Sequence, residues 1–262
     1  MLNIIVCIKQ VLDPEAPTST YKVDAETKRM LQQGVPPVMS PFDTNALEAA
    51  LRIKATTPSK ITVISLGKNL SKPVLRQSLA AGADDLILLE DNTFDGLDSY
   101  TTATILAAAI KKIEKYDLIF TGIQAADWNA GIVGSGIAEL LKIPCITHAK
   151  KVEVHENNVK VECVTTDGYT IIDAPLPALI TVRNELGELR SAPIKEVMAA
   201  QKRPIITWNS VMLGIEPEKL RRVEMLSLFI PTKISRCEVI KGDNEEQTAA
   251  NLALRLKEEN II

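Results

Sequence analysis

Cysteine and histidine are scarce in this 262-residue chain, which holds four cysteines and two histidines. None of the cysteines forms a CxxC pair, and only one of them, Cys145, has a histidine close by in the sequence. Zinc sites and redox dithiols need ligands that are brought close together, so neither is predicted. We interpret the scattered residues Cys7, Cys145, Cys163 and Cys237 as reduced thiols of an intracellular protein.

Strong net charge and long apolar runs are also absent. The formal net charge of −3 gives no general attraction for nucleic acid or for an anionic membrane. The first ten residues lack the charged and apolar regions of a secretory signal peptide, and no apolar run reaches membrane-spanning length. We therefore expect a cytoplasmic protein without nucleic-acid binding or membrane insertion.

Aromatic residues make up only 4% of the chain, against 46% for all hydrophobic residues. Most of the apolar content is aliphatic, as in buried parallel strands covered by helices. Short apolar runs at Leu2–Ile8, Lys60–Leu66, Asp85–Leu89 and Asp117–Thr121 alternate with segments of helical periodicity. These helical segments are Asp43–Ala55, Lys72–Ala81, Ser99–Lys115 and Ile132–Lys142. The alternation predicts an α/β fold with an open, mostly parallel, doubly wound sheet.

Two antiparallel additions are expected beside this sheet. The first connection carries a short pattern that indicates a small β-hairpin turning at Asp24–Thr27. Later, Ala149–Val154 and Val159–Thr165 flank a turn signal and should pair antiparallel. A further strand is predicted at Ala178–Val182, and a short helix at Ala192–Gln201.

The chain is predicted to divide into an α/β nucleotide-binding domain, residues 1–205, and a C-terminal arm, residues 206–262. Periodicity weakens after Ile205 and returns only in an amphipathic helix at Glu245–Glu259. Such an arm either packs on a partner subunit or folds back on its own domain. The sequence leaves both alternatives open.

The segment Ser40–Asp43 precedes the first predicted helix. Ser40 suits the N-cap, Pro41 the first helical position, and Asp43 completes a capping box. This helix also begins beside the end of the first strand, where open α/β sheets bind ligands. Its free backbone N–H groups could hold a base edge or an anion there.

A second candidate feature is the loop after the predicted strand Asp117–Thr121. It leads into a helix that opens with Gly131, Gly134 and Gly136. Glycine at such a place lets a phosphate approach the positive end of the helix. Alternatively, the glycines let the helix pack closely on the sheet, and we weigh the two interpretations about equally.

In their order, these motifs resemble the electron transfer flavoprotein beta-subunit family over roughly the first 205 residues. The resemblance implies an electron carrier rather than a catalyst, the small subunit of a heterodimer with an alpha subunit that holds most of the redox FAD. It also implies an adenine nucleotide in the strand-end cleft, either AMP or, in electron-bifurcating members, a second FAD. The matching motifs are Ile8–Asp13, Ser40–Asp43, Ala80–Asp84 and Gly122–Asp127.

By matching position, the resemblance assigns one set of residues to the nucleotide. The adenosine side comprises Cys7, Ser40, Pro41, Phe42, Asp43 and Leu66. The phosphate and ribose side comprises Gln124, Ala125, Asp127, Asn129, Gly131, Val133, Gly134 and Ser135.

The sequence departs from the family pattern at two places in this set. Ser40 stands where the family commonly has Asn, and in the loop from Asp127 to Gly134 only Asp127, Val133 and Gly134 match the family pattern well. Trp128 either stacks on a nucleotide ring or covers an apolar gap.

The resemblance also implies a docking residue and a flavoenzyme partner. Ile194 matches an exposed aliphatic anchor that docks on acyl-CoA dehydrogenases or similar flavoenzymes. In the alternative interpretation, Ile194 has no docking role and is the first core residue of its helix. A rival function, a stand-alone adenine-nucleotide sensor, shares the layout but does not need the C-terminal arm.

Overall fold

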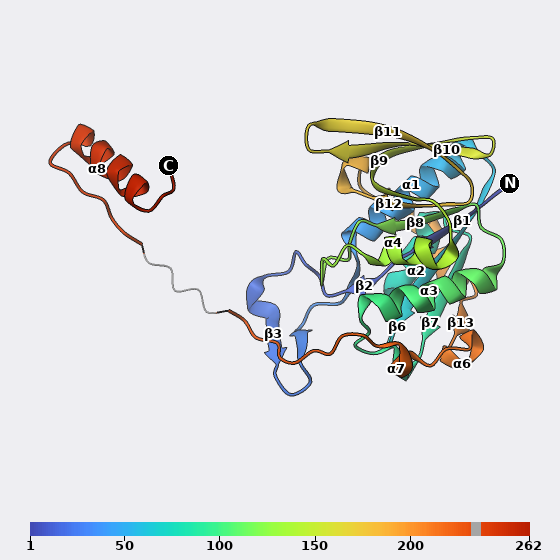
Figure 1. The fold of residues 1–262 in the computed structure, drawn as a ribbon. Coiled ribbons are helices and arrows are strands. Elements are labelled where there is room, and N and C mark those ends of the chain that lie inside the picture. The colour runs from blue at the N-terminus through green and yellow to red at the C-terminus, as the bar shows by residue number, and fades with distance from the viewer. Residues whose placement is uncertain (232–236) are drawn as a thin grey trace. The chain divides into compact units, whose positions relative to one another are not determined.

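The structure is a computed structural model that describes residues 1–231 and 237–262. The chain forms two compact units, Met1–Ser227 and Leu228–Ile262. The first unit is built on a nine-stranded sheet with the strand order β11-β10-β9-β12-β8-β1-β6-β7-β13 (Figure 1). The predicted α/β class and mostly parallel sheet are confirmed.

The parallel part of the sheet forms as the apolar runs predict. Its strands pair in parallel with their neighbours, and β1 lies between β6 and β8, so that Val6 faces Val63 on one side and Phe120 on the other. These three residues are completely buried, because both faces of the sheet are covered. The strands are β1 (Leu2–Cys7), β6 (Ser59–Gly67), β7 (Asp85–Glu90), β8 (Leu118–Gly122) and β12 (Ala178–Val182).

Helices cover the two faces of this sheet. Helices α1 (Pro41–Thr56) and α2 (Lys72–Ala81) pack on one face, and α3 (Ser99–Ile113) and α4 (Val133–Leu141) pack on the other. Figure 1 shows α3 and α4 side by side on one face. Because side chains alternate along a strand, Val6 belongs to the first apolar core and its neighbours in β1 to the second. All four helices lie where helical periodicity predicts them.

An antiparallel extension continues the sheet beyond β12. Strand β9 (Cys145–His155) runs parallel to β12 and pairs antiparallel with β10 (Asn158–Thr165), which confirms the predicted pair. A third strand, β11 (Gly168–Pro175), pairs with β10 and was not predicted. It forms the sheet edge with nearly all of its residues exposed, so it lacks the alternation of polar and apolar residues that marks a half-buried strand.

Short elements fill the long first connection. The predicted hairpin is confirmed as β3 (Tyr21–Asp24) paired with β4 (Arg29–Gln32). A two-residue bridge joins β2 (Gln10–Val11) to β5 (Val38–Met39). The connection also holds a 3-10 turn at Thr18–Thr20, and the described residues form further 3-10 turns at Asn92–Phe94 and Asn184–Leu186.

The end of the first unit extends past residue 205. After α5 (Ile194–Lys202), strand β13 (Ile206–Trp208) pairs in parallel with β7, and two short helices follow, α6 (Ser210–Leu213) and α7 (Pro217–Leu220). Residues 206–227, assigned from sequence to the arm, therefore belong to the unit that contains the sheet. A three-residue strand is too short to show a periodicity.

The described residues of the second unit form one helix, α8 (Glu245–Glu258), close to its predicted range. Asn244 caps it by accepting a hydrogen bond from the backbone N–H of Gln247, and Arg255 pairs with Glu238. No residue of α8 is buried. Across the residues that the structure describes, no helix combines the length and the apolar character needed to cross a membrane.

Candidate functional site

The predicted nucleotide residues gather at the carboxyl edge of the sheet, around β1. From β1 the chain passes to β6 and β7 on one side, then returns to β8 on the other side. Such a topological switch point leaves a crevice outside the strand ends, where open α/β sheets bind ligands. Cys7 ends β1, Leu66 lies near the end of β6, and Gly122 ends β8.

The start of α1 lines this crevice, but the predicted capping box does not form. Ser40 is the N-cap, yet its side chain makes no capping hydrogen bond. The backbone N–H of Ser40 instead donates to the carbonyl of Lys9 over 2.8 Å, so the group that a capping box would satisfy is already paired. The Ser40 hydroxyl accepts a long hydrogen bond of 3.4 Å from the N–H of Ala126.

Asp43 joins the ends of two neighbouring strands. Its carboxylate accepts hydrogen bonds from the backbone N–H groups of Lys9, over 2.8 Å, and Gly122, over 2.9 Å. The side chain is buried, and burial raises its pKa to about 7, against the lowering effect of these two hydrogen bonds. Asp43 thus holds the backbone after β1 and the end of β8 together at the buried side of the crevice.

Gly122 is required by the close approach of α1. A Cβ atom at this position would lie 2.6 Å from Oδ1 of Asp43 and 2.7 Å from the backbone carbonyl carbon of Phe42. Such distances are closer than packed atoms tolerate. The glycine that opens the family-like loop therefore has a packing reason of its own.

The loop after β8 closes the outer side of the crevice. Nζ of Lys9 lies 2.6 Å from Oδ2 of Asp127, so an ion pair spans the two loops that follow β1 and β8. Within the loop, Gln124 donates to the side chain of Asn129 over 3.0 Å. Asn129 and Gly131 adopt left-handed φ angles of 52° and 68°, which favour these residue types.

The rim of this loop is apolar and exposed. Trp128 is 61% exposed and Ile132 is 59% exposed. Two large apolar side chains on the loop beside the crevice provide a surface that a ring or a second subunit could cover.

Helix α4 directs its N-terminus toward the crevice. The first N–H groups of a helix have no acceptor within it and carry a partial positive charge, so those of Val133–Ser135 can donate to an anion. Gly134 packs directly on the sheet, because a Cβ there would lie 2.6 Å from Oγ1 of Thr121 and 2.9 Å from Cγ2 of Thr181. The structure thus supports close packing as one reason for this glycine.

Cys7 offers no nucleophile at the site. Burial raises the pKa of the Cys7 thiol to about 12, so the thiol stays protonated and unreactive. The Ser135 hydroxyl lies 3.8 Å from Sγ of Cys145. The arrangement suits the binding of a nucleotide by backbone groups rather than covalent catalysis.

Ile194 is held at the surface. It begins α5 and is 80% exposed. Together with the next turn of the helix it lines a mainly apolar hollow of about 600 Å³, formed by Ile194, Lys195, Met198, Ala199 and Lys202.

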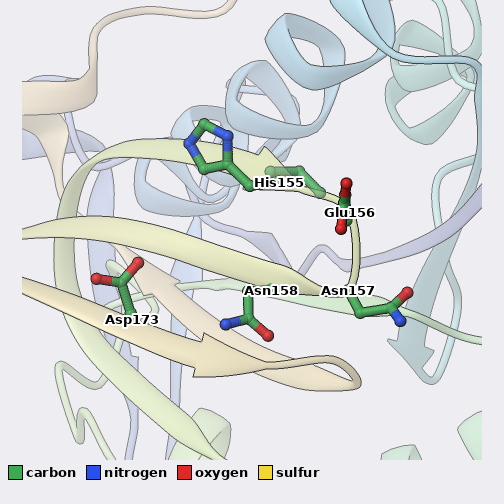
Figure 2. Close-up of a pocket in the computed structure, with 6 residues that line it drawn as sticks. His155, Glu156, Asn157, Asn158 and Asp173 are labelled. Atoms are coloured by element: carbon green, nitrogen blue, oxygen red, sulfur yellow. The ribbon is translucent and has the colours of Figure 1, made fainter.

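Another hollow, of about 650 Å³, lies at the turn between β9 and β10. Figure 2 shows His155, Glu156, Asn157 and Asn158 around this turn, with Asp173 on the adjacent strand β11. None of the predicted nucleotide residues lines it. Its polar side chains belong to the exposed end of the antiparallel extension, away from the strand ends that surround the crevice.

Comparison with known proteins decides the family. A family model described as the electron transfer flavoprotein domain matches residues 27–211, more than half of the chain. The chain belongs to the electron transfer flavoprotein family. Its relatives include caffeyl-CoA reductase-Etf complex subunit CarD of Acetobacterium woodii, 37% identical with complete coverage of both chains.

Further relatives place the chain with the beta subunits of this family. The electron transfer flavoprotein subunit beta of Thermoanaerobacterium thermosaccharolyticum is 36% identical, again over the whole of both chains. Protein FixA of Azotobacter vinelandii is 34% identical over 97% of this chain and 93% of its own length. The predicted family and the predicted electron-transfer function of a beta subunit are confirmed.

Some residues of the site were absent from the predicted set. Lys9 follows the end of β1 and faces Asp127, and its position just after a buried strand was the available signal. Glu48 and Arg190 pair across long sequence separation. No local pattern shows that the loop before α5 folds back on α1.

Proposed function

We propose that this chain is the small subunit of a heterodimer with an electron transfer flavoprotein alpha subunit, and that it binds an adenine nucleotide in the crevice between β1 and β8. It also helps to enclose the redox FAD, through which electrons pass from an acyl-CoA dehydrogenase or a similar flavoenzyme to an acceptor. The observation that carries the nucleotide proposal is the switch-point crevice itself. Asp43 fixes it on one side, and the N-terminus of α4 faces it on the other.

Each wall of the crevice suits a different part of a nucleotide. The N–H groups of Val133–Ser135 would hold the phosphate, aided by the helix dipole. Cys7, Leu66 and Ser40–Phe42 would surround the adenosine. When FAD is bound, its ring accepts and releases electrons, while the protein positions it and sets its potential.

The apolar rim favours a second candidate ligand. AMP ends at its phosphate, whereas FAD continues to a flat, largely apolar ring system. Trp128 and Ile132, both exposed, offer a surface that such a ring could cover. A second FAD in this subunit, as in an electron-bifurcating member, is therefore the alternative to AMP.

A titration of the stripped heterodimer tests the proposal and separates the two ligands. Heterodimer that keeps its redox FAD but has been freed of any other nucleotide would be titrated with AMP and, separately, with FAD in a calorimeter. Saturable binding of either ligand supports nucleotide binding in the crevice. The ligand with the lower Kd is then assigned as the one that the crevice binds. Failure of both to bind would refute the nucleotide proposal.

The partner flavoenzyme docks on Ile194 in this proposal. An exposed aliphatic side chain beside an apolar hollow suits insertion into a pocket of a partner. We expect Ile194→Ala to weaken electron transfer from an acyl-CoA dehydrogenase about tenfold or more, as for a hot-spot truncation of 1.4 kcal/mol or more, with an unchanged flavin content. Stopped-flow kinetics of flavin reduction measures this effect, and unchanged kinetics would refute the docking role.

A further inference from the structure

Helix α1 contacts the chain on both sides of the crevice and also reaches the segment ahead of α5. Two residues after Asp43, the Asn45 side chain donates a hydrogen bond of 2.6 Å to the carbonyl of Gly187. Gly187 itself has a φ of +114°, and a Cβ there would lie 2.8 Å from Nη2 of Arg52. The segment therefore crosses α1 in close contact.

A second tie lies at Glu48 on the same helix. Its carboxylate accepts from Nε and Nη2 of Arg190 over 3.0 and 2.9 Å, and from the Arg190 backbone N–H over 3.2 Å. Arg52 donates to the same carboxylate over 3.2 Å. A two-bond arginine–carboxylate pair fixes orientation as well as distance.

The pair is anchored by a buried charge. The Glu48 side chain is only 6% exposed, whereas that of Arg190 is 43% exposed. Burial alone would raise the pKa of Glu48, but the hydrogen bonds and charges of Arg190 and Arg52 lower it further than burial raises it. A buried carboxylate that stays ionised needs its charged partner. Removing either member of the pair therefore destabilises the fold.

The position of this tie matters because little of α5 itself is buried, although Leu189 and Ala192 just ahead of it pack against the apolar core. Within α5 only Ala200 is buried, and Arg76, from α2, binds the carbonyls of Ala200 and Arg203 at the far end. At the near end, Arg190 lies one short loop before Ile194. The Glu48 tie is thus, together with the Asn45–Gly187 hydrogen bond, a polar contact that fixes the approach to Ile194.

We propose that Glu48 is a positioning residue for partner docking, which holds the segment Gly187–Pro193 on helix α1 so that Ile194 is presented in one orientation. This inference rests on the docking role proposed for Ile194 above. It adds a residue that touches neither the partner nor the nucleotide, yet sets how well the anchor is placed.

The test compares Glu48→Gln with Ile194→Ala in the full heterodimer. The assay follows flavin reduction by an acyl-CoA dehydrogenase that reduces the wild-type heterodimer, over a range of heterodimer concentrations. We expect Glu48→Gln to raise KM about five- to tenfold, a change on the scale of one broken charged contact, while kcat and FAD content stay unchanged. The double variant should show a KM no higher than that of Ile194→Ala alone.

A matched control is available in the same segment. Glu185→Gln makes the same chemical change to a carboxylate that pairs with Arg183 near the surface and does not bond α1, so its KM should match that of the wild type. Arg190→Lys keeps the charge but loses the two-bond geometry, and should give an intermediate KM. If the Glu48→Gln chain fails to assemble into the heterodimer, Arg190→Lys tests the positioning role in its place.

The outcomes separate this inference from the docking proposal. If Ile194→Ala raises KM while Glu48→Gln and Arg190→Lys do not, Glu48 has no positioning role and the docking proposal stands. If Ile194→Ala has no effect, both proposals are overturned. If Glu48→Gln lowers FAD content or kcat instead of raising KM, its role is structural and the inference is again overturned.

Discussion

At the scale of single residues, the carboxylate of Asp43 connects β1 and β8, whose ends lie far apart in the sequence. Its two acceptor bonds go to backbone N–H groups, which an amide cannot satisfy equally, because the NH₂ group of an Asn would face a donor. Asp43 therefore has a role that neither a surface carboxylate nor a capping residue fills.

Replacement of this carboxylate should destabilise the fold. At pH 8 we expect Asp43→Asn to lower the free energy of unfolding by about 1–3 kcal/mol, the cost of leaving a buried donor unpaired. Urea denaturation measures it. Asp127→Asn is the control, since it removes an exposed ion pair on the same crevice and should cost no more than about 1 kcal/mol; equal losses in the two variants would contradict this role of Asp43.

The same residue gives the stability a dependence on pH. The folded pKa of Asp43, about 7, is higher than its ordinary value of 3.8. Folding therefore favours the protonated form of Asp43. The stabilisation of the fold that results is complete below about pH 4 and is lost as the pH rises through about 7. The loss of stability caused by Asp43→Asn should be larger at pH 5 than at pH 8, as denaturation at the two pH values will show. The opposite order would mean that the carboxyl is ionised in the fold at pH 5.

Sequence reasoning located this residue but misjudged its bonds. A capping box is a local pattern, and it identified the start of α1 correctly. One of its two actual partners, Gly122, lies 79 positions away, and no local pattern reveals such a contact. The same limit hid the pairing of Glu48 with Arg190.

At the scale of single elements, helix α4 combines close packing with a free N-terminus. Ala is a better helix former than Gly by up to about 1 kcal/mol, so Gly134→Ala should stabilise an isolated helix. In the protein, the new Cβ would collide with Thr121 and Thr181 and move the helix away from the sheet.

We therefore expect Gly134→Ala to lower both the stability and the nucleotide content of the heterodimer. Overpacking of this kind costs about 1–3 kcal/mol. Gly136→Ala is the matched control on the same helix, because its nearest neighbour, Cβ of Ala103, lies at 3.0 Å and the clash is milder. Thermal denaturation and nucleotide extraction measure both variants; a stabilised Gly134→Ala protein would contradict the packing account.

Elements were predictable where burial imposes a period. The parallel strands are apolar because both faces are covered, and helices α2 to α4 show one apolar side, whereas α1 is buried on nearly all sides. Strands β11 and β13 escaped prediction for different reasons. Nearly all of β11 is exposed, so no face selects apolar residues, and β13 has three residues, too few for any pattern.

At the scale of the whole molecule, the two compact units differ in their cores. The buried apolar clusters lie entirely within the unit Met1–Ser227, whereas α8 buries no residue. We propose that the second unit is completed by the partner subunit, one of the two alternatives that the sequence left open for the arm.

Truncation after Ser227 tests this division. Because the apolar clusters remain, we expect the shortened chain to keep its cooperative unfolding transition within about 1 kcal/mol. It should no longer form a stable complex with the alpha subunit in size-exclusion chromatography. Undiminished assembly would show that the second unit is not needed for pairing.

The central claim is that the crevice between β1 and β8 binds an adenine nucleotide. The most direct measurement is the nucleotide content of the heterodimer as purified, released by denaturation and quantified by chromatography. The account predicts an adenine nucleotide, AMP or a second FAD, in addition to the redox FAD of the heterodimer. A heterodimer that carries the redox FAD alone, or no nucleotide at all, would contradict it.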